Sequence, residues 1–394
     1  MNIEIKPLTE QQIKWAPLAL GFRPFFLLGI WFAVLLMAVS LGAFATGIWH
    51  YNYFDLSLWH AHEMVFGYAT AVVAGFLLTA TGNWTGLPTP SGKSLALLAL
   101  LWLAPRLLSS VPFVPGVAFA LLDLLFLPVL AVVIGRLILK AKQSHNYPVP
   151  LLLMGLAFCN GLVHLEVLGF VEQLSSQAMQ IAVCLMLALI VVIAGRVVPF
   201  FMQKAIGTRP TTYALIEQFA LPSALLVGLA LAVDIEWLTV IATLIAAVVH
   251  GARLMSWFDR AVFSQPMLWV LHIGYFWLVA GFLIYGLSVW KGIPTQQAMH
   301  AWTVGAISMF TLGMMTRVAL GHTGRAIEAL AWMPAAFVLM FIATVARVLL
   351  PFINPDWLDV SVTFSAMCWI VAFVLVGIRY SSMLLRARVD GKEG

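Results

Sequence analysis

The sequence predicts an all-α polytopic membrane protein with about twelve transmembrane helices. Of its 394 residues, 62% are hydrophobic and only 9% are charged, whereas soluble domains carry about 25% charged residues. The apolar residues fall into runs of about 20, which is the length that crosses a bilayer as a helix. Clusters of proline, glycine and polar residues separate these runs. We therefore expect the chain to be embedded in a lipid bilayer.

Twelve apolar runs are expected to span the membrane. They cover residues 24–48, 60–81, 94–110, 115–139, 149–169, 177–201, 213–232, 237–257, 267–290, 298–318, 327–350 and 359–383. The third run is short, and prolines mark several linkers, as in Pro148-Val149-Pro150 and Asn354-Pro355. We expect one transmembrane domain over residues 1–394, which begins with a short amphipathic cytoplasmic segment at 1–23.

The basic residues predict the orientation of these helices. With the N-terminus inside, all but Arg106, Lys291 and Arg347 of the 21 lysines and arginines lie on or near the inner side. Cytoplasmic loops of membrane proteins carry such an excess of basic residues. Both termini are therefore predicted to be cytoplasmic. The formal net charge of +5 follows from this topology and gives no reason to expect a nucleic acid partner.

Histidines gather at the outer ends of the predicted helices. The stretch Trp59-His60-Ala61-His62-Glu63 opens the second span, and His300 opens the tenth. His164 lies roughly 8 Å below the outer end of the fifth span, at about 1.5 Å per residue. Ionisable groups in a membrane span are costly and are functional candidates by default. Four imidazoles on three helices thus share one outer layer.

A second group of histidines lies toward the inner side. It consists of His250 and His272 within the eighth and ninth spans and His322 just after the tenth. Imidazole is the commonest metal ligand in proteins, and haem iron is often held by histidines of facing helices. The alternative is a structural hydrogen bond between helices. Four imidazoles in one layer weaken that alternative, because each unneeded one costs insertion energy.

Helical geometry separates the two histidines of the second span. Residues two apart point about 160° away from each other around the axis, so His60 and His62 cannot bind the same metal. His60 shares its face with the small residues Gly67, Ala71 and Gly75. Such a face admits either a porphyrin or a closely packed helix, and the sequence leaves that choice open.

Four other charged residues are candidates for supporting roles. Glu63 and Asp123 lie within spans near the outer side. Either can hold a proton or orient a ligand imidazole, or simply bond a tryptophan or hydroxyl group. Arg196 and Arg317 lie near the inner ends of their helices. They can pair with carboxylates such as haem propionates, or they can extend toward the interface as structural residues.

Several long motifs resemble the NnrS family over nearly the whole chain. They are Gly21-Phe22-Arg23-Pro24-Phe25-Phe26, His60-Ala61-His62-Glu63-Met64, Gly75-Phe76-Leu77-Leu78-Thr79, Asn83-Trp84-Thr85-Gly86, Gly195-Arg196-Val197-Val198-Pro199, Leu271-His272-Ile273-Gly274-Tyr275 and the run from Met315 to Arg325. The resemblance implies a multi-pass protein of the bacterial inner membrane with haem and copper. It also implies a role in nitric oxide metabolism, nitrosative stress and denitrification.

The chain is also distantly similar to subunit I of the haem–copper oxidases and nitric oxide reductases, which implies a similar bundle. By that likeness, His62 and His300 are the axial ligands of a b-type haem (heme b). The chain departs from those enzymes because its sixth and seventh spans have no histidine and Trp302 stands where a second histidine is expected. Copper must then use another set of histidines. The candidates are His60, His164, His250, His272 and His322.

These features favour a haem/copper protein that binds or reduces nitric oxide, or a derived nitrosyl species, at a haem iron. Electrons would come from quinone or another membrane electron donor. Two alternatives remain open: a non-catalytic haem sensor, and a metal-handling or transport protein whose two histidine layers form a relay. Consumption of nitric oxide separates an enzyme from a sensor, and metal uptake into proteoliposomes identifies a transporter.

Overall fold

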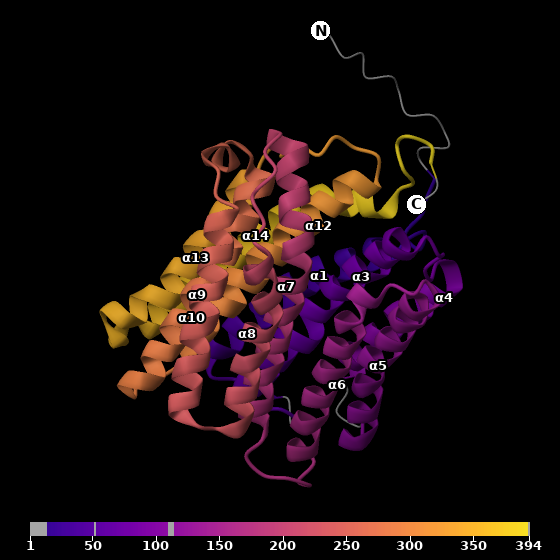
Figure 1. Cartoon of the computed structure of the whole chain (residues 1–394). Helices are drawn as coiled ribbons and strands as arrows, with labels where there is room; N and C mark the ends of the chain where they lie inside the picture. Colours follow the sequence, from indigo (N-terminus) through magenta and orange to yellow (C-terminus); the bar gives the residue numbers. More distant parts are fainter. Residues whose placement is uncertain (1–13, 51–52, 109–113, 393–394) are drawn as a thin grey trace.

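All regular elements in the described part of the chain are helices (Figure 1). The computed structural model describes residues 14–50, 53–108 and 114–392. The helices are α1 (Phe22–Thr46), α2 (Leu56–His62), η2 (Glu63–Ala69), α3 (Thr70–Thr85), α4 (Gly92–Leu108), α5 (Gly116–Lys140), η3 (Ser144–Asn146), α6 (Pro148–Val167), α7 (Ser175–Ile206), α8 (Ala214–Val233), α9 (Glu236–Ser256), η4 (Arg260–Ser264), α10 (Pro266–Lys291), α11 (Gln296–His300), η5 (Ala301–Ile307), α12 (Ser308–His322), α13 (Met333–Ile353), η6 (Pro355–Trp357) and α14 (Leu358–Leu385). The predicted all-α fold is confirmed.

The number of helices also agrees with the prediction. Eleven helical stretches are long and apolar enough to cross a membrane, and α4, with 17 residues, corresponds to the short third span. The chain is therefore a multi-pass membrane protein. The largest shift at the start of a span is in the eleventh, which begins at Met333 instead of residue 327. Residues 323–332 form turns before it.

Two of the spans contain a π-helical segment near their outer ends. The second, which we call helix II, joins α2, η2 and α3, and the tenth, helix X, joins α11, η5 and α12. Asp55 caps the start of helix II by accepting the backbone N–H of Leu58. Both π segments begin directly after a histidine, His62 in helix II and His300 in helix X. Single π turns inside α-helices often mark functional sites.

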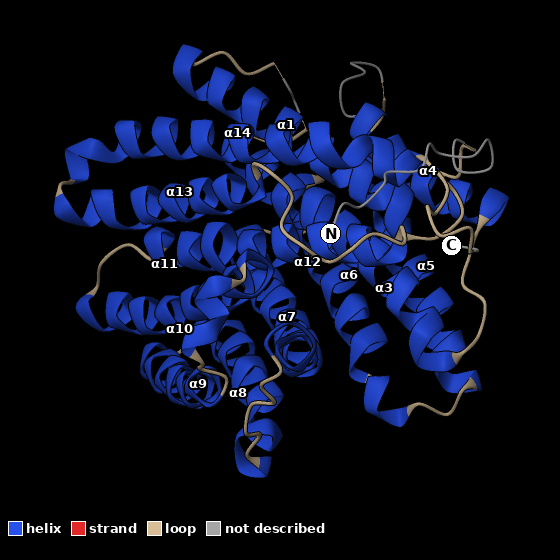
Figure 2. Ribbon diagram, turned by 90° about the horizontal axis from the view of Figure 1, so that it is seen from above, coloured by secondary structure: helices blue, strands red, loops and turns tan. Residues whose placement is uncertain are grey.

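Helices II and X form the interior of the bundle. In their apolar stretches 83% and 89% of residues are buried, whereas the other spans range from 39% to 67%. In the end-on view α12 lies between the pair α13–α14 and α7 (Figure 2). A hydrogen bond joins the two interior helices directly, because the Tyr68 hydroxyl lies 2.7 Å from Thr311 Oγ1. The histidines at their outer ends are thus placed on the most enclosed part of the fold.

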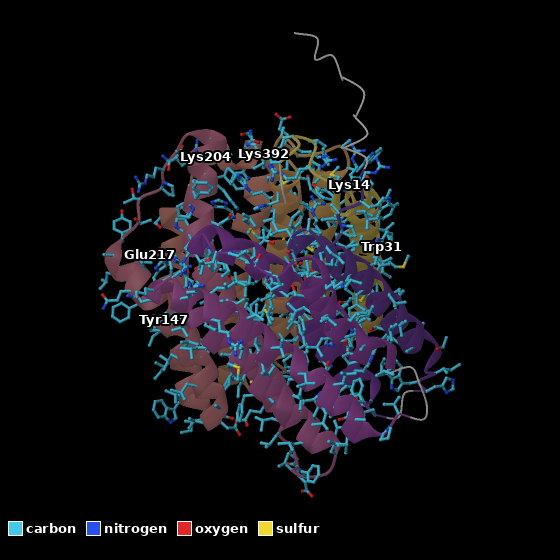
Figure 3. The ribbon with its side chains drawn as sticks, turned by 90° about the vertical axis from the view of Figure 1, so that its right-hand side faces the viewer. Lys14, Trp31, Tyr147, Lys204, Glu217 and Lys392 are labelled. Atoms are coloured by element: carbon cyan, nitrogen blue, oxygen red, sulfur yellow. The ribbon has the colours of Figure 1, made fainter. Side chains whose placement is uncertain are left out.

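The two ends of the described chain meet at one end of the bundle. The backbone N–H of Ala16 donates to Leu385 O at 2.9 Å, and that of Ala387 donates to Lys14 O at 2.9 Å. Lys14, Lys204 and Lys392 lie toward this same end (Figure 3). A chain that crosses a membrane twelve times, an even number, must have both ends on the same side. The cytoplasmic location of this end stays a prediction, and the first thirteen residues of the expected amphipathic segment lie outside the described residues.

Candidate functional site

A cluster of buried polar side chains connects helix II with α4, α5 and α6 near their outer ends. We call it the outer polar cluster. Its members are His62, Glu63, Arg106, Asp123, Asn160 and His164, none of which is more than 8% exposed. Burying charged groups is costly unless they are paired and hydrogen-bonded. The bonds within the cluster therefore decide what it can do.

Arg106 is the positive centre of this cluster. Its Nε lies 3.1 Å from Glu63 Oε2, and its Nη1 lies 2.7 Å from Asp123 Oδ1. Its Nη2 donates to Phe66 O, a carbonyl of the π segment, at 2.8 Å. We expected Arg106 at the outer face, but it turns inward, because the two carboxylates and this carbonyl lie inside the bundle.

His62 has an acceptor on each ring nitrogen. Its Nδ1 lies 3.1 Å from Glu63 Oε1, and its Nε2 lies 2.9 Å from Asn160 Oδ1 and 3.4 Å from Asp123 Oδ2. The amide of Asn160 donates to Asp123 Oδ2 at 2.7 Å, so its Oδ1 is left to accept. Both nitrogens of His62 therefore carry protons in this arrangement. Two cations, His62 and Arg106, then balance two carboxylates.

His164 completes the cluster from α6. Its Nε2 lies 3.2 Å from Asp123 Oδ2, and its Nδ1 lies 2.9 Å from the Tyr53 hydroxyl. Burial and the charge of Asp123 raise the pKa of Tyr53 above its usual range, so the phenol keeps its proton and donates it to His164. One ligand atom each from His62, Asp123 and His164 lies within 4.8 Å of the others. Among the described residues, this trio is the set of three histidine, cysteine or acidic side chains close enough to hold one metal ion together.

His60 and His300 form a different kind of site. Ser40 Oγ donates to Leu36 O at 2.8 Å and must therefore accept from His60 Nδ1, which lies 2.9 Å away. His300 Nδ1 donates to Gln296 O at 2.6 Å. Within the described chain, neither imidazole has a hydrogen bond at Nε2. Each ring is therefore fixed through one nitrogen and offers the lone pair of the other.

Arg347 of α13 accompanies this pair. Its guanidinium lies close enough to act electrostatically on both His60 and His300, and His60 also acts on His300. Its Nη1 is buried and has no hydrogen-bond partner among the residues that the structure describes. His300 is thus grouped with His60, while the contacts of His62 run to Glu63 and the helices on its other side. The structure does not bring His62 and His300 together.

Two of the three inner histidines, His250 and His272, are occupied by protein partners. His250 Nδ1 lies 2.7 Å from the Tyr275 hydroxyl, and its Nε2 lies 3.4 Å from Ser223 Oγ. His272 faces the backbone carbonyls of Leu268 at 3.0 Å and Trp257 at 3.4 Å. These bonds do not bring the two imidazoles into a shared site. In the described chain they match the alternative of structural hydrogen bonds between helices.

The remaining candidates have separate surroundings. Arg196 bonds the carbonyl of His145 at 2.8 Å and the side chain of Asn146, so it holds the loop before α6. Arg317 and His322 line a cavity at the inner ends of the helices. The structure therefore separates the two predicted arginines, giving Arg196 a structural contact and leaving Arg317 beside open space.

Sequence reasoning missed four residues of these two sites. Arg106 and Arg347 were counted only as charges of the outer side, and Asn160 and Tyr53 were not singled out. One usable signal was present for Arg106, since it lies at the outer end of its span at the same level as Glu63 and Asp123. Opposite charges at one depth of a membrane bundle are expected to pair.

Comparison with known proteins agrees with this picture of an integral membrane protein. The family model described as NnrS protein matches residues 16–388, which is nearly the whole chain. A search among curated proteins finds no matching sequence.

Proposed function

Because the chain belongs to the NnrS family, we propose that it acts in the bacterial inner membrane as a haem protein that binds nitric oxide. Family membership supports a membrane protein tied to the nitric oxide response. The proposal adds the haem and its ligands, and it places a b-type haem between His60 and His300. It differs from the expectation drawn from the oxidases, which paired His300 with His62.

One observation carries the proposal, namely the free Nε2 of both His60 and His300. Histidines that ligate a metal almost always donate their other ring N–H to a carbonyl, a carboxylate or another acceptor, which fixes the ring. Ser40 and Gln296 are such acceptors. By contrast, both nitrogens of His62 and His164 already have partners, which are Tyr53 for His164 Nδ1 and members of the outer polar cluster for the other three.

Arg347 supports the same assignment. A guanidinium with a buried, unpartnered nitrogen requires an acceptor, and carboxylates are its best partners. A haem carries two propionate groups, so Arg347 would bind one of them while His60 and His300 hold the iron. When bound, the haem would supply an iron that can take a diatomic ligand.

Nitric oxide binding gives the first test. We expect the Soret band of the purified, reduced protein to shift when nitric oxide is added, because a bound diatomic changes the ligand field of the iron. The measurement is a titration followed by optical spectroscopy together with a nitric oxide electrode. An unchanged spectrum would refute the proposal. Continued consumption would identify an enzyme, whereas binding that stops at one equivalent would identify a sensor.

A second candidate is a copper site at His62, Asp123 and His164. The atoms are arranged suitably, because Asp123 Oδ2 lies 3.4 Å from His62 Nε2 and 3.2 Å from His164 Nε2. Ligands about 2.1 Å from a tetrahedral ion are roughly 3.4 Å apart. Binding would displace the protons of the two Nε2 atoms, and Glu63 would remain bonded to His62 Nδ1 as an orienting partner.

The copper candidate makes a separable prediction. We expect His164→Gln and Asp123→Asn each to lower the copper content of the purified protein about tenfold or more, while the haem content stays unchanged. Inductively coupled plasma mass spectrometry measures the metal, and the pyridine haemochrome assay measures the haem. His272→Gln is the matched control, since His272 bonds only backbone carbonyls. If both variants retain copper at full stoichiometry, the outer polar cluster does not bind the copper. The cluster would then serve only as a network that shares protons among its members.

A further inference from the structure

A cavity of about 290 Å³ lies among the inner ends of α3, α7 and α12, away from both sites described above. Its lining residues are Phe76, Thr79, Ala80, Asn83, Trp84, Val197, Phe200, Phe201, Met314, Arg317, Val318, Gly321, His322 and Ile327. Most of this wall is aliphatic or aromatic. Phe200 is 53% exposed on the surface of a membrane-spanning helix, so the cavity reaches the apolar side of the bundle.

Arg317 is the feature of this cavity that requires an explanation. It is only 5% exposed, and its Nε is buried without a hydrogen-bond partner. Within the described chain it forms neither a hydrogen bond nor an ion pair, and its guanidinium lies 3.8 Å from the centre of the Phe201 ring. Arg253, at a similar level of the bundle, is paired with Glu217. An unpaired guanidinium in a membrane interior points to an acceptor that the protein does not supply.

His322 adds a second hydrogen-bonding group to the same wall. It lies at the end of α12, and its ring packs against Phe22 at 5.7 Å between ring centres. Its backbone carbonyl accepts from Arg388, but its ring nitrogens have no hydrogen bond in the described chain. The cavity thus combines two available polar groups on α12 with largely apolar walls from α3 and α7, to which α3 adds Thr79 and Asn83.

We propose that this cavity binds the head group of a membrane quinone. A quinone ring is flat, apolar on both faces and carries two carbonyl oxygens that accept hydrogen bonds. Arg317 would donate to one oxygen and His322 to the other, while the isoprenoid tail would leave past Phe200 into the lipid. The volume lies at the lower end of the range of small-molecule pockets, which suits a head group more than a whole cofactor.

The main competitor for this cavity is the phosphate of an anionic phospholipid. A phosphate favours several cations or N–H groups, whereas Arg317 is the single lysine or arginine among the described lining residues. A phosphate would also leave most of the apolar wall of the cavity without a contact. Only the use of the quinone as electron donor for nitric oxide chemistry rests on the proposed function.

The test uses the purified full-length protein with decylubiquinone and, separately, dioleoyl phosphatidylglycerol. Trp84 lines the cavity, so a bound quinone should quench its fluorescence, and a Trp84→Phe variant identifies that part of the signal. We expect Arg317→Gln to weaken decylubiquinone binding about tenfold or more and Arg317→Lys to weaken it less. Ala80→Phe should abolish binding by filling the space. Arg379→Gln, an exposed arginine of α14, is the control and should bind normally.

Unchanged quinone affinity in both Arg317→Gln and Ala80→Phe would overturn the proposal, as would phosphatidylglycerol binding that depends on Arg317 and excludes the quinone. If Arg317→Gln fails to elute as a monodisperse protein, Arg317→Lys and Ala80→Phe decide. His60→Ala separates the two proposals, because it should lose haem while retaining quinone affinity. Quinone binding with no haem in the native protein would contradict the proposed function alone.

Discussion

His60→Ala and His300→Ala proteins are each expected to lose their haem absorption, whereas His62→Gln is expected to retain it. The reason is the free Nε2 of His60 and His300, since Ser40 and Gln296 occupy only the Nδ1 atoms. His62 instead bonds acceptors through both nitrogens. Removing an axial ligand should lower haem content about tenfold or more, because even outer partners of a metal site have effects of that size. The pyridine haemochrome assay on purified protein measures it.

This experiment distinguishes two ligand assignments that share His300. The resemblance to the oxidases assigns the second ligand to His62, and the geometry assigns it to His60. Loss of haem in His62→Gln together with normal haem in His60→Ala would refute the geometric assignment. Ser40→Ala is a milder variant, because it removes only the acceptor that orients His60. It should keep the haem but broaden its absorption or shift its midpoint potential.

The second large effect is expected at Arg106. Arg106→Met should lower the free energy of unfolding by about 3–5 kcal/mol, because breaking a buried ion pair leaves an uncompensated charge behind. Here two carboxylates, Glu63 and Asp123, would lose their shared cation, and the carbonyl of Phe66 would lose a donor. Denaturation by sodium dodecyl sulfate, followed by circular dichroism, gives the change in unfolding free energy.

Two comparisons make this result specific. Arg136→Met removes an exposed arginine near the other end of the bundle and should change the unfolding free energy by less than about 0.5 kcal/mol. The triple variant Arg106→Met, Glu63→Gln, Asp123→Asn should recover part of the loss, since no unpaired charge is left. A loss below about 1 kcal/mol for Arg106→Met alone, the size typical of exposed pairs, would show that the cluster is hydrated.

The fold could be predicted from the sequence almost completely, because hydropathy specifies which segments cross the bilayer. The short third span and the helix boundaries agree with the structure within a few residues, apart from the eleventh span. Interruptions of the regular helix could not be predicted. Nothing in the composition of residues 63–69 or 301–307 distinguishes a π segment from an α-helical one. Apart from Glu63 and Thr303, both segments consist of apolar or aromatic residues, glycine and alanine.

The site could be predicted only as a set of histidines at one depth. Helical geometry predicts that His60 and His62 point in different directions, and in the structure they do. The hydrogen-bond partners of the two histidines cannot be predicted in this way, because they depend on how the neighbouring helices are rotated. His164 reaches His62 through Asp123, a contact among three separate helices. From the sequence, Arg347 counts only as one of three basic residues on the outer side, because the imidazoles it accompanies lie on other helices.

The π segments also set the angular phase of the two histidine-bearing helices. Each residue of an α-helix turns the chain by about 100°, and a π turn holds more residues than an α turn. Moving one residue into or out of η2 would rotate the outer end of helix II relative to its inner half, α3. The hydrogen bond between Tyr68 and Thr311 holds the inner end of η2 against helix X. Such a rotation would swing His60 and His62 together. A shift that turns one of these imidazoles away from its partners would therefore turn the other as well.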